Sequence, residues 1–232
     1  MNEIDQATVL KAAELFKQWM FTAGGDTRTL VPATGFVEGM DNRYGLKNMQ
    51  IDEHLRWKDG MAGINLGYEK EEAQRWIVSR CVESTEPIKY GDTIAIGYGT
   101  QPTWVNHEEQ TFGPNLEFQS KSSCEWKIFG GPIGTPVKTN ERVALLNEKY
   151  GEPVVHVDRP VGANIGPASA RKDFWDKVKD LFQDIGDVIE AVAKVLDLYE
   201  SVTESDEQPN PGEATRILPG EPGVVSGSAI KP

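Results

Sequence analysis

The sequence predicts an all-β core made of three repeats of about 50 residues, flanked by an amphipathic helix on each side. The pattern Gly-x-Asn-(Leu/Ile), with a tryptophan thirteen residues after the glycine, occurs three times. Short runs of β-branched and aromatic residues, separated by Gly-, Pro- and Asn-rich turns, fill residues 28–170. Apolar residues at helical spacing lie on both sides of this region.

The segment 1–25 is predicted to be an N-terminal amphipathic helix. Val9, Ala13 and Phe16 recur at helical spacing, and a glycine pair beginning at Gly24 follows, which is a common way for a helix to end. Such a helix needs a surface to cover its apolar face.

The internal repeat divides the chain at about residues 38–87, 88–136 and 137–175. Five positions keep the same offsets in every unit. They are Leu46, Leu55, Gly63, Asn65 and Trp76, then Ile96, Val105, Gly113, Asn115 and Trp126, then Leu145, Val154, Gly162, Asn164 and Trp175. The aliphatic and tryptophan positions are predicted to be core, and the Gly-x-Asn positions to be turns.

Each unit holds about four short strand candidates, so three units give twelve strands, the number in a β-trefoil. The sequence QRW that ends at Trp76 matches the Q-x-W of ricin-type lectin repeats, although CEW at Trp126 and DFW at Trp175 do not. The segments IKYGDTIAI, GTPVKTNERVALLNEKYG and VGANIG, within residues 88–166, resemble those of fascin-like and agglutinin-type β-trefoil proteins. The resemblance covers residues 28–175, implies a binding fold rather than an enzyme, and carries over no ligand residues.

One departure from the trefoil pattern concerns the third tryptophan. Trp175 runs directly into a helical pattern, so the twelfth strand is either missing or supplied by residues 28–37. The sequence leaves both alternatives open.

Residues 171–202 are predicted to form a long C-terminal amphipathic helix. Val178, Ile185 and Val192 repeat every seven residues, and about thirty residues make a rod of roughly 45 Å. Its apolar stripe is wider than a minimal coiled-coil seam, and the N-terminal helix is too short to cover it. We therefore expect self-association or a partner at this helix. Residues 203–232, rich in Pro, Gly, Ser and acidic residues, are predicted to be a disordered or extended tail.

The composition limits the classes of partner and compartment. A net charge of −12 and a pI near 4.8 argue against a nucleic-acid partner, because binding phosphates requires clustered Lys and Arg. No basic start with an apolar run and no long apolar stretch occur, so we expect a protein that is cytoplasmic as synthesised, without a transmembrane segment. Export by a non-standard route stays open. Cys81 and Cys124 match no metal-ligand spacing and are expected to be free thiols.

No catalytic or phosphate-binding motif is present, so we expect no enzyme activity, no cofactor and no metal site. The glycine-rich segment GGPIGTP (130–136) is predicted to be a turn. The best ligand-binding candidates form one cluster, in which an aromatic platform lies beside hydrogen-bonding groups: Trp104, Asn106, His107 and Glu108.

A further ligand-binding candidate is Trp57, which occupies the same repeat position as His107 and His156. These three side chains either line a pocket or pack the end of the predicted β-structure.

The leading functional hypothesis is a non-enzymatic binding protein that recognises a ligand, such as a carbohydrate or a protein, with helices that mediate assembly. The alternatives are a structural or assembly protein, and a toxin-like component whose amphipathic helix engages a partner or a membrane.

Overall fold

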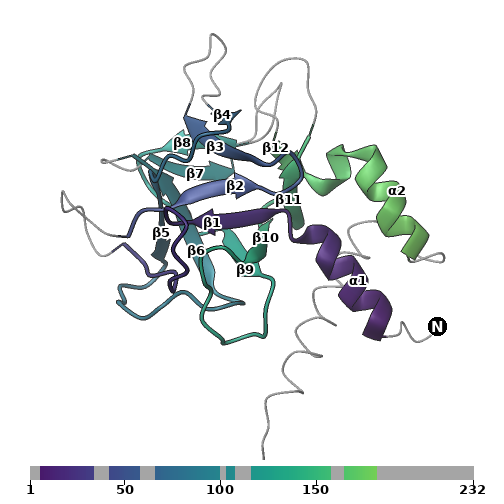
Figure 1. The fold of residues 1–232 in the computed structure, drawn as a ribbon, viewed down its shortest axis with the longest axis horizontal. Helices are drawn as coiled ribbons and strands as arrows, with labels where there is room; N and C mark the ends of the chain where they lie inside the picture. Colours follow the sequence, from purple (N-terminus) through teal and green to yellow (C-terminus); the bar gives the residue numbers. More distant parts are fainter. Residues whose placement is uncertain are drawn as a thin grey trace, which may run out of the picture.

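The computed structural model describes residues 6–33, 42–57, 66–99, 103–107, 116–157 and 165–181. In these ranges the chain forms twelve strands and two α-helices (Figure 1). In chain order the elements are α1 (Gln6–Phe16), β1 (Trp19–Thr22), β2 (Gly45–Asn48), β3 (Glu53–Trp57), β4 (Leu66–Glu69), β5 (Trp76–Arg80), β6 (Thr93–Tyr98), β7 (Thr103–His107), β8 (Leu116–Gln119), β9 (Trp126–Phe129), β10 (Arg142–Asn147), β11 (Glu152–His156), β12 (Ile165–Pro167), the 3-10 turn η1 (Ala168–Ala170) and α2 (Lys172–Leu181).

The strands join into one antiparallel sheet of twelve. Six of them close into a ring, because β1 pairs with β2 and β10, and β6 pairs with β5 and β9. The pair β9–β10 and a bridge between Tyr44 and Trp76, which joins β2 to β5, complete the ring. In that bridge each backbone N–H donates a 2.9 Å hydrogen bond to the other residue's carbonyl. The other six strands form the pairs β3–β4, β7–β8 and β11–β12.

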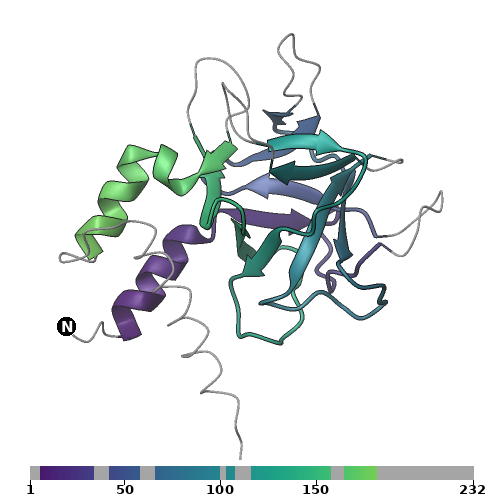
Figure 2. The same ribbon diagram turned by 180° about the vertical axis from the view of Figure 1, so that it is seen from behind.

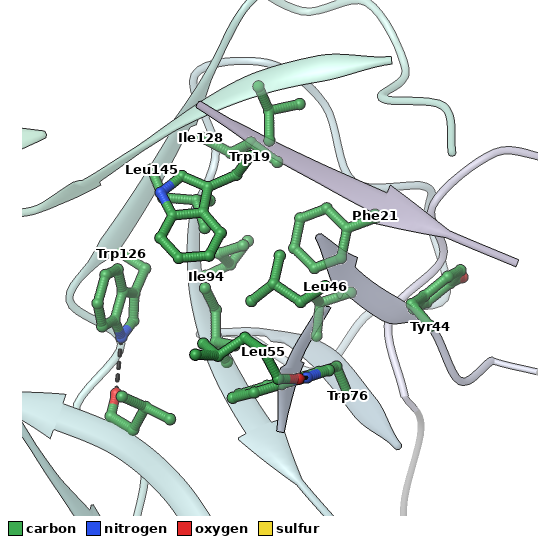
Figure 3. Close-up of a cluster of buried hydrophobic side chains, with 14 of the residues drawn as sticks. Trp19, Phe21, Tyr44, Leu46, Leu55, Trp76, Ile94, Trp126, Ile128 and Leu145 are labelled. Atoms are coloured by element: carbon green, nitrogen blue, oxygen red, sulfur yellow. Dashed lines mark hydrogen bonds between the residues drawn. The ribbon is translucent and has the colours of Figure 1, made fainter. Parts of the chain in front are cut away.

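Three buried indoles hold the centre of the ring together (Figure 3). The Nε1 of Trp19 donates a 2.6 Å hydrogen bond to the carbonyl of Val154. Trp76 and Trp126 donate equivalent 2.7 Å bonds to the carbonyls of Leu55 and Val105. The same contact therefore ties three ring strands to three of the attached strands, and it satisfies each indole N–H away from water.

The predicted aliphatic core positions are confirmed. All six are at most 5% exposed and belong to one cluster with the three indoles: Leu46, Leu55, Ile96, Val105, Leu145 and Val154. The space left between them is an apolar cavity of about 20 Å³, roughly the room for one water molecule. The axis of the ring is thus a packed core and offers no room for a ligand.

The predicted fold class is wrong. We expected a β-trefoil of three repeats with a long C-terminal helix, whereas the structure has one large antiparallel sheet and two short helices. The helix α2 spans 10 residues and packs near α1, with Val178 buried. The remainder of the predicted helix, after Leu181, and the tail 203–232 lie outside the described residues.

The position of the third tryptophan is also corrected. Trp175 lies in α2, and its expected place in the ring is occupied by Trp19. The N-terminal helix ends at Phe16, after which Trp19, Phe21 and Ala23 are buried at the two-residue period of a strand. The strand β1 therefore closes the ring, and neither alternative left open by the sequence is correct.

The segment 28–37, which was one of those alternatives, forms no strand in its described part, residues 28–33. It contributes one bridge, between Thr29 and Lys138, and the buried side chain of Leu30. Across the described ranges, no helix is long and apolar enough to cross a membrane.

Candidate functional site

A cleft of about 430 Å³ lies between the end of α1 and the chain that links β9 to β10. Figures 1 and 2 show α1 beside β10, with the strand pairs β3–β4 and β7–β8 at the other end of the molecule. The cleft is lined by Glu14, Lys17, Tyr90, Gly130, Gly131, Pro132, Thr135, Pro136, Lys138, Glu141 and Arg142.

Five residues of the glycine-rich segment 130–136 line the cleft, and the prediction of this segment as a turn is confirmed. Thr135 N–H donates to the carbonyl of Pro132 at 3.1 Å, and Gly134 N–H donates to the carbonyl of Tyr90 at 3.0 Å. A Cβ on Gly131 would lie 2.3 Å from the Tyr90 ring. Glycine is needed there because the aromatic ring lies directly on the backbone.

Tyr90 fixes one acidic side chain at the cleft. Its ring is buried, and its hydroxyl donates a 3.0 Å hydrogen bond to the Oε2 of Glu141. The carboxylate of Glu141 is otherwise exposed to solvent. One of its oxygens is thereby held in place, and the other remains able to accept a hydrogen bond from a ligand.

Lys17 contributes a cation at the point where α1 gives way to β1. Its side chain is 15% exposed, and its Nζ lies 2.6 Å from the Oε1 of Glu14 one helical turn earlier. The helix ends at Phe16, and Lys17, the residue directly after it, lines the cleft. A mostly covered ammonium is better placed than a fully solvated one to bind an anion.

Two more cations complete the cleft. Lys138 and Arg142 are exposed and have no ion-pair or side-chain hydrogen-bond partner among the described residues. The lining therefore holds three cationic and two acidic side chains, although the whole chain carries a net charge of −12. The lining thus carries one positive charge in excess, and one of its cations, Lys17, is already paired with Glu14.

The predicted cluster around Trp104 is divided between the two faces of β7. Trp104 and Asn106 share one face, while His107 lies on the other, because side chains alternate along a strand. The His107 ring contacts the Tyr150 ring edge-on at 4.9 Å. Glu108 lies outside the described residues.

The amide of Asn106 is used within the protein. It is buried and donates to the Oε1 of Gln119 at 2.9 Å and to the carbonyl of Lys121 at 2.6 Å. Its Oδ1 accepts from the N–H of Ser123 at 3.2 Å. These contacts hold the chain between β8 and β9 in place and occupy the groups that would contact a sugar.

Trp57 and His156 also pack against aromatic rings. The half-buried Trp57 ring lies 4.6 Å from Phe118 and stacks with Tyr98 at 6.4 Å. His156 is buried, and its ring is 5.3 Å from Tyr68. The geometry corresponds to packing rather than to an open pocket, and ligand binding by these residues stays a prediction.

The sequence missed the cleft because its charged residues come from distant segments. Lys17 and Arg142 meet only because β1 pairs with β10, where Met20 lies opposite Arg142. The one local signal was the glycine-rich segment 130–136 followed closely by Lys138. Within the described part of the chain, no group of three or more His, Cys, Asp or Glu side chains is placed to hold a metal ion.

Comparisons with protein-family models, with curated proteins and with solved structures found no match to this chain. The resemblance to fascin-like and agglutinin-type proteins therefore stays a prediction.

Proposed function

We propose that this protein is a non-enzymatic binding protein that takes a small acidic saccharide in the cleft between α1 and the segment 130–142. The convergence of Lys17, Lys138 and Arg142 on one cleft of about 430 Å³ carries this proposal. That volume lies within the range of roughly 300–1,000 Å³ typical of small-molecule sites.

The cationic side chains suit the carboxylate of such a ligand. Arginine presents a planar fork of donors that matches a carboxylate, and lysine supplies a point charge. Arg142 and Lys138 can both reorient toward a ligand because they are exposed and no described residue pairs with them.

The acidic side chains suit the hydroxyls of a sugar. Carboxylates accept hydrogen bonds from hydroxyl groups, and Glu14 and Glu141 line the same cleft as the cations. The Tyr90 ring lies against Gly131 and is buried, so it offers no stacking platform. Recognition would therefore depend on hydrogen bonds and charge, and binding would weaken as salt concentration rises.

The overall charge restricts the size of the ligand. A chain of net charge −12 repels long polyanions as they approach, whereas a saccharide with one carboxylate needs only to pair with Arg142 or Lys138. We therefore favour mono- to trisaccharides that contain a uronic or sialic acid.

A glycan array printed with neutral, uronic-acid and sialic-acid glycans tests the proposal. The expected result is binding to a subset of the acidic glycans, lost in Arg142→Ala and retained in Lys149→Ala, an exposed control away from the cleft lining. Binding that is confined to neutral glycans, or that persists in Arg142→Ala, would contradict it. An array with no hits on folded protein would remove the saccharide class.

The other predicted functions depend on the residues after Leu181. One is assembly through the C-terminal helix, and the other is a toxin-like role in which that helix engages a partner or a membrane. Both rest on a helical pattern that lies mostly outside the described residues. They stay predictions.

A further inference from the structure

Internal pairing cancels some of the charges that line the cleft. The Nζ of Lys17 lies 2.6 Å from the Oε1 of Glu14, so these two side chains neutralise each other. Lys138, Arg142 and Glu141 line the same cleft, and none of them forms an ion pair within the described part of the chain. A ligand therefore meets two cations and one carboxylate whose charges are not cancelled by a described neighbour.

A neutral hydroxyl holds the carboxylate of Glu141 in place. The Tyr90 hydroxyl donates a 3.0 Å hydrogen bond to the Oε2 of Glu141. A neutral donor orients a carboxylate without cancelling its charge, whereas a lysine or arginine partner would do both. Glu141 thus offers a ligand a full negative charge and one oxygen that the Tyr90 bond does not use.

The Tyr90 side chain is itself fixed by its surroundings. Its ring is buried, its backbone N–H donates to the carbonyl of Thr135 at 3.0 Å, and its carbonyl accepts from the N–H of Gly134 at 3.0 Å. A Cβ on Gly131 would overlap the ring, so the ring lies directly on the backbone. The hydroxyl that orients Glu141 therefore has a defined position at the cleft.

The three uncancelled charges are carried by one short segment, residues 138–142. Between them, the buried Thr139 donates from its N–H to the carbonyl of Arg28 at 2.8 Å. The N–H of Asn140 donates to the carbonyl of Phe21, also at 2.8 Å. These bonds fix the backbone of the segment against β1 and the chain that follows it, so the fold sets the spacing of the three charged side chains.

We propose that Glu141 determines specificity in this cleft by binding an ammonium group, so that the preferred ligand is an acidic saccharide that also carries a free amino group. The carboxylate of such a sugar binds Arg142 and Lys138, and its ammonium group binds the open oxygen of Glu141. This inference rests on the proposed function, because it takes the acidic saccharide and its contacts with the two cations as given.

An ammonium group uses Glu141 better than a sugar hydroxyl does. It brings three donors and a positive charge, and hydrogen bonds between charged groups are roughly twice as strong as those between neutral groups. An acetylated amino group has lost that charge. Glu14 is less suited to the same role, because Lys17 already pairs with it.

Titration calorimetry of the full chain with three related sugars tests the proposal. They are glucuronic acid, glucosaminuronic acid, which has an amino group in place of one hydroxyl, and the N-acetyl form of the latter. At low salt we expect the amino sugar to bind about three- to tenfold more tightly than the other two. Glu141→Gln should remove this preference, because the amide oxygen still accepts from Tyr90 but the charge is gone. The control Glu71→Gln, exposed and away from the cleft lining, should keep it.

Equal affinity of the unsubstituted chain for the amino sugar and for glucuronic acid would overturn the proposal, and so would a preference that survives in Glu141→Gln. Glucose as a fourth ligand separates this failure from failure of the proposed function. A chain that prefers glucuronic acid to glucose but ignores the amino group loses only the role of Glu141. A chain that binds none of these sugars, or binds glucose as tightly as glucuronic acid, loses both.

Tyr90→Phe gives a second test, of the positioning role of the hydroxyl. The buried ring is kept, and Glu141 keeps its charge but loses the bond that orients it. The preference for the amino sugar should fall without vanishing, while the preference for glucuronic acid over glucose should stay unchanged. An undiminished preference for the amino sugar would contradict the role given to Tyr90.

Discussion

The indole Nε1 of Trp19 donates a 2.6 Å hydrogen bond to the carbonyl oxygen of Val154, across 135 positions of the sequence. This contact fastens the first strand of the chain to the next-to-last one. The strand β1, between β2 and β10, thereby closes the ring on which the whole core depends.

Replacing Trp19 by Phe should destabilise the protein more than the same change at Trp104. Trp19→Phe leaves the buried carbonyl of Val154 without its donor and removes part of a fully buried ring, a loss of about 2–4 kcal/mol. Trp104 is half-buried on β7, so Trp104→Phe should cost under about 1 kcal/mol. Urea unfolding followed by fluorescence measures the unfolding free energy of both variants. Equal losses of unfolding free energy would argue against the role of β1 in closing the ring.

Replacing Glu125 by Gln should disturb a buried network. The Glu125 carboxylate accepts from the Asn147 amide at 2.9 Å, from the Ser123 hydroxyl at 2.6 Å and from a backbone N–H. Glutamine removes the negative charge that these donors share, and its NH2 fits only where the Ser123 hydroxyl turns to accept from it, so the change should cost about 1–3 kcal/mol of unfolding free energy.

The matched control for this change is Glu148→Gln. Glu148 is exposed and accepts one hydrogen bond, from Thr93 at 3.1 Å. Glu148→Gln should therefore lower the unfolding free energy by less than about 1 kcal/mol. Chemical denaturation of both variants gives the comparison, and a larger loss in the control would contradict the role given to Glu125.

Two glycines of the segment 130–136 should respond differently to alanine. A Cβ on Gly131 would lie 2.3 Å from the Tyr90 ring, so Gly131→Ala must displace the ring and should cost about 1–3 kcal/mol. Gly134 has open space around it but a φ of 85°, so Gly134→Ala should cost only about 1 kcal/mol. Thermal unfolding would show the order, and the reverse order would mean that the Tyr90 contact does not fix the turn.

The tyrosine at position 44 should ionise only at unusually high pH. Burial raises the pKa of Tyr44, against smaller opposing effects of a hydrogen bond with Val31 and of the Arg28 charge. Because the folded-state pKa lies above the unfolded value, the stability it contributes is present below about pH 10 and is lost as pH rises through the folded pKa.

Titration of tyrosine ionisation, followed by ultraviolet absorbance, measures the pKa of Tyr44, with Tyr44→Phe as the reference. The difference between the unsubstituted chain and Tyr44→Phe should show no ionisation near pH 10, where free tyrosine titrates. An ordinary titration of this group in the folded protein would contradict its burial.

The core could be predicted from the sequence because its pattern is repeated. Leu46, Ile96 and Leu145 lie at the same spacing from the tryptophan of their respective repeats. This regularity predicted that all three are buried, as they are. The prediction failed at the N-terminal end of the described chain. The apolar residues around Trp19 fit a helix and a strand equally well over so short a stretch, and only pairing with β10 decides between them.

The candidate site was less accessible to sequence reasoning. Asn106 looks like a free ligand group in the sequence, yet Gln119 and Lys121 occupy its amide in the fold. Nothing in the sequence relates Lys17 to Arg142, and only the pairing of distant strands places them on one cleft.

Titration calorimetry with glucuronic acid and with glucose tests the central claim about the cleft most directly. The two sugars differ by one carboxylate, which Arg142 and Lys138 are placed to bind. At low salt we expect the unsubstituted chain to bind glucuronic acid at least about tenfold more tightly than glucose, a preference worth about 1.4 kcal/mol that Arg142→Ala removes. Equal affinity for both sugars, or a preference that survives in Arg142→Ala, would contradict the assignment of this cleft.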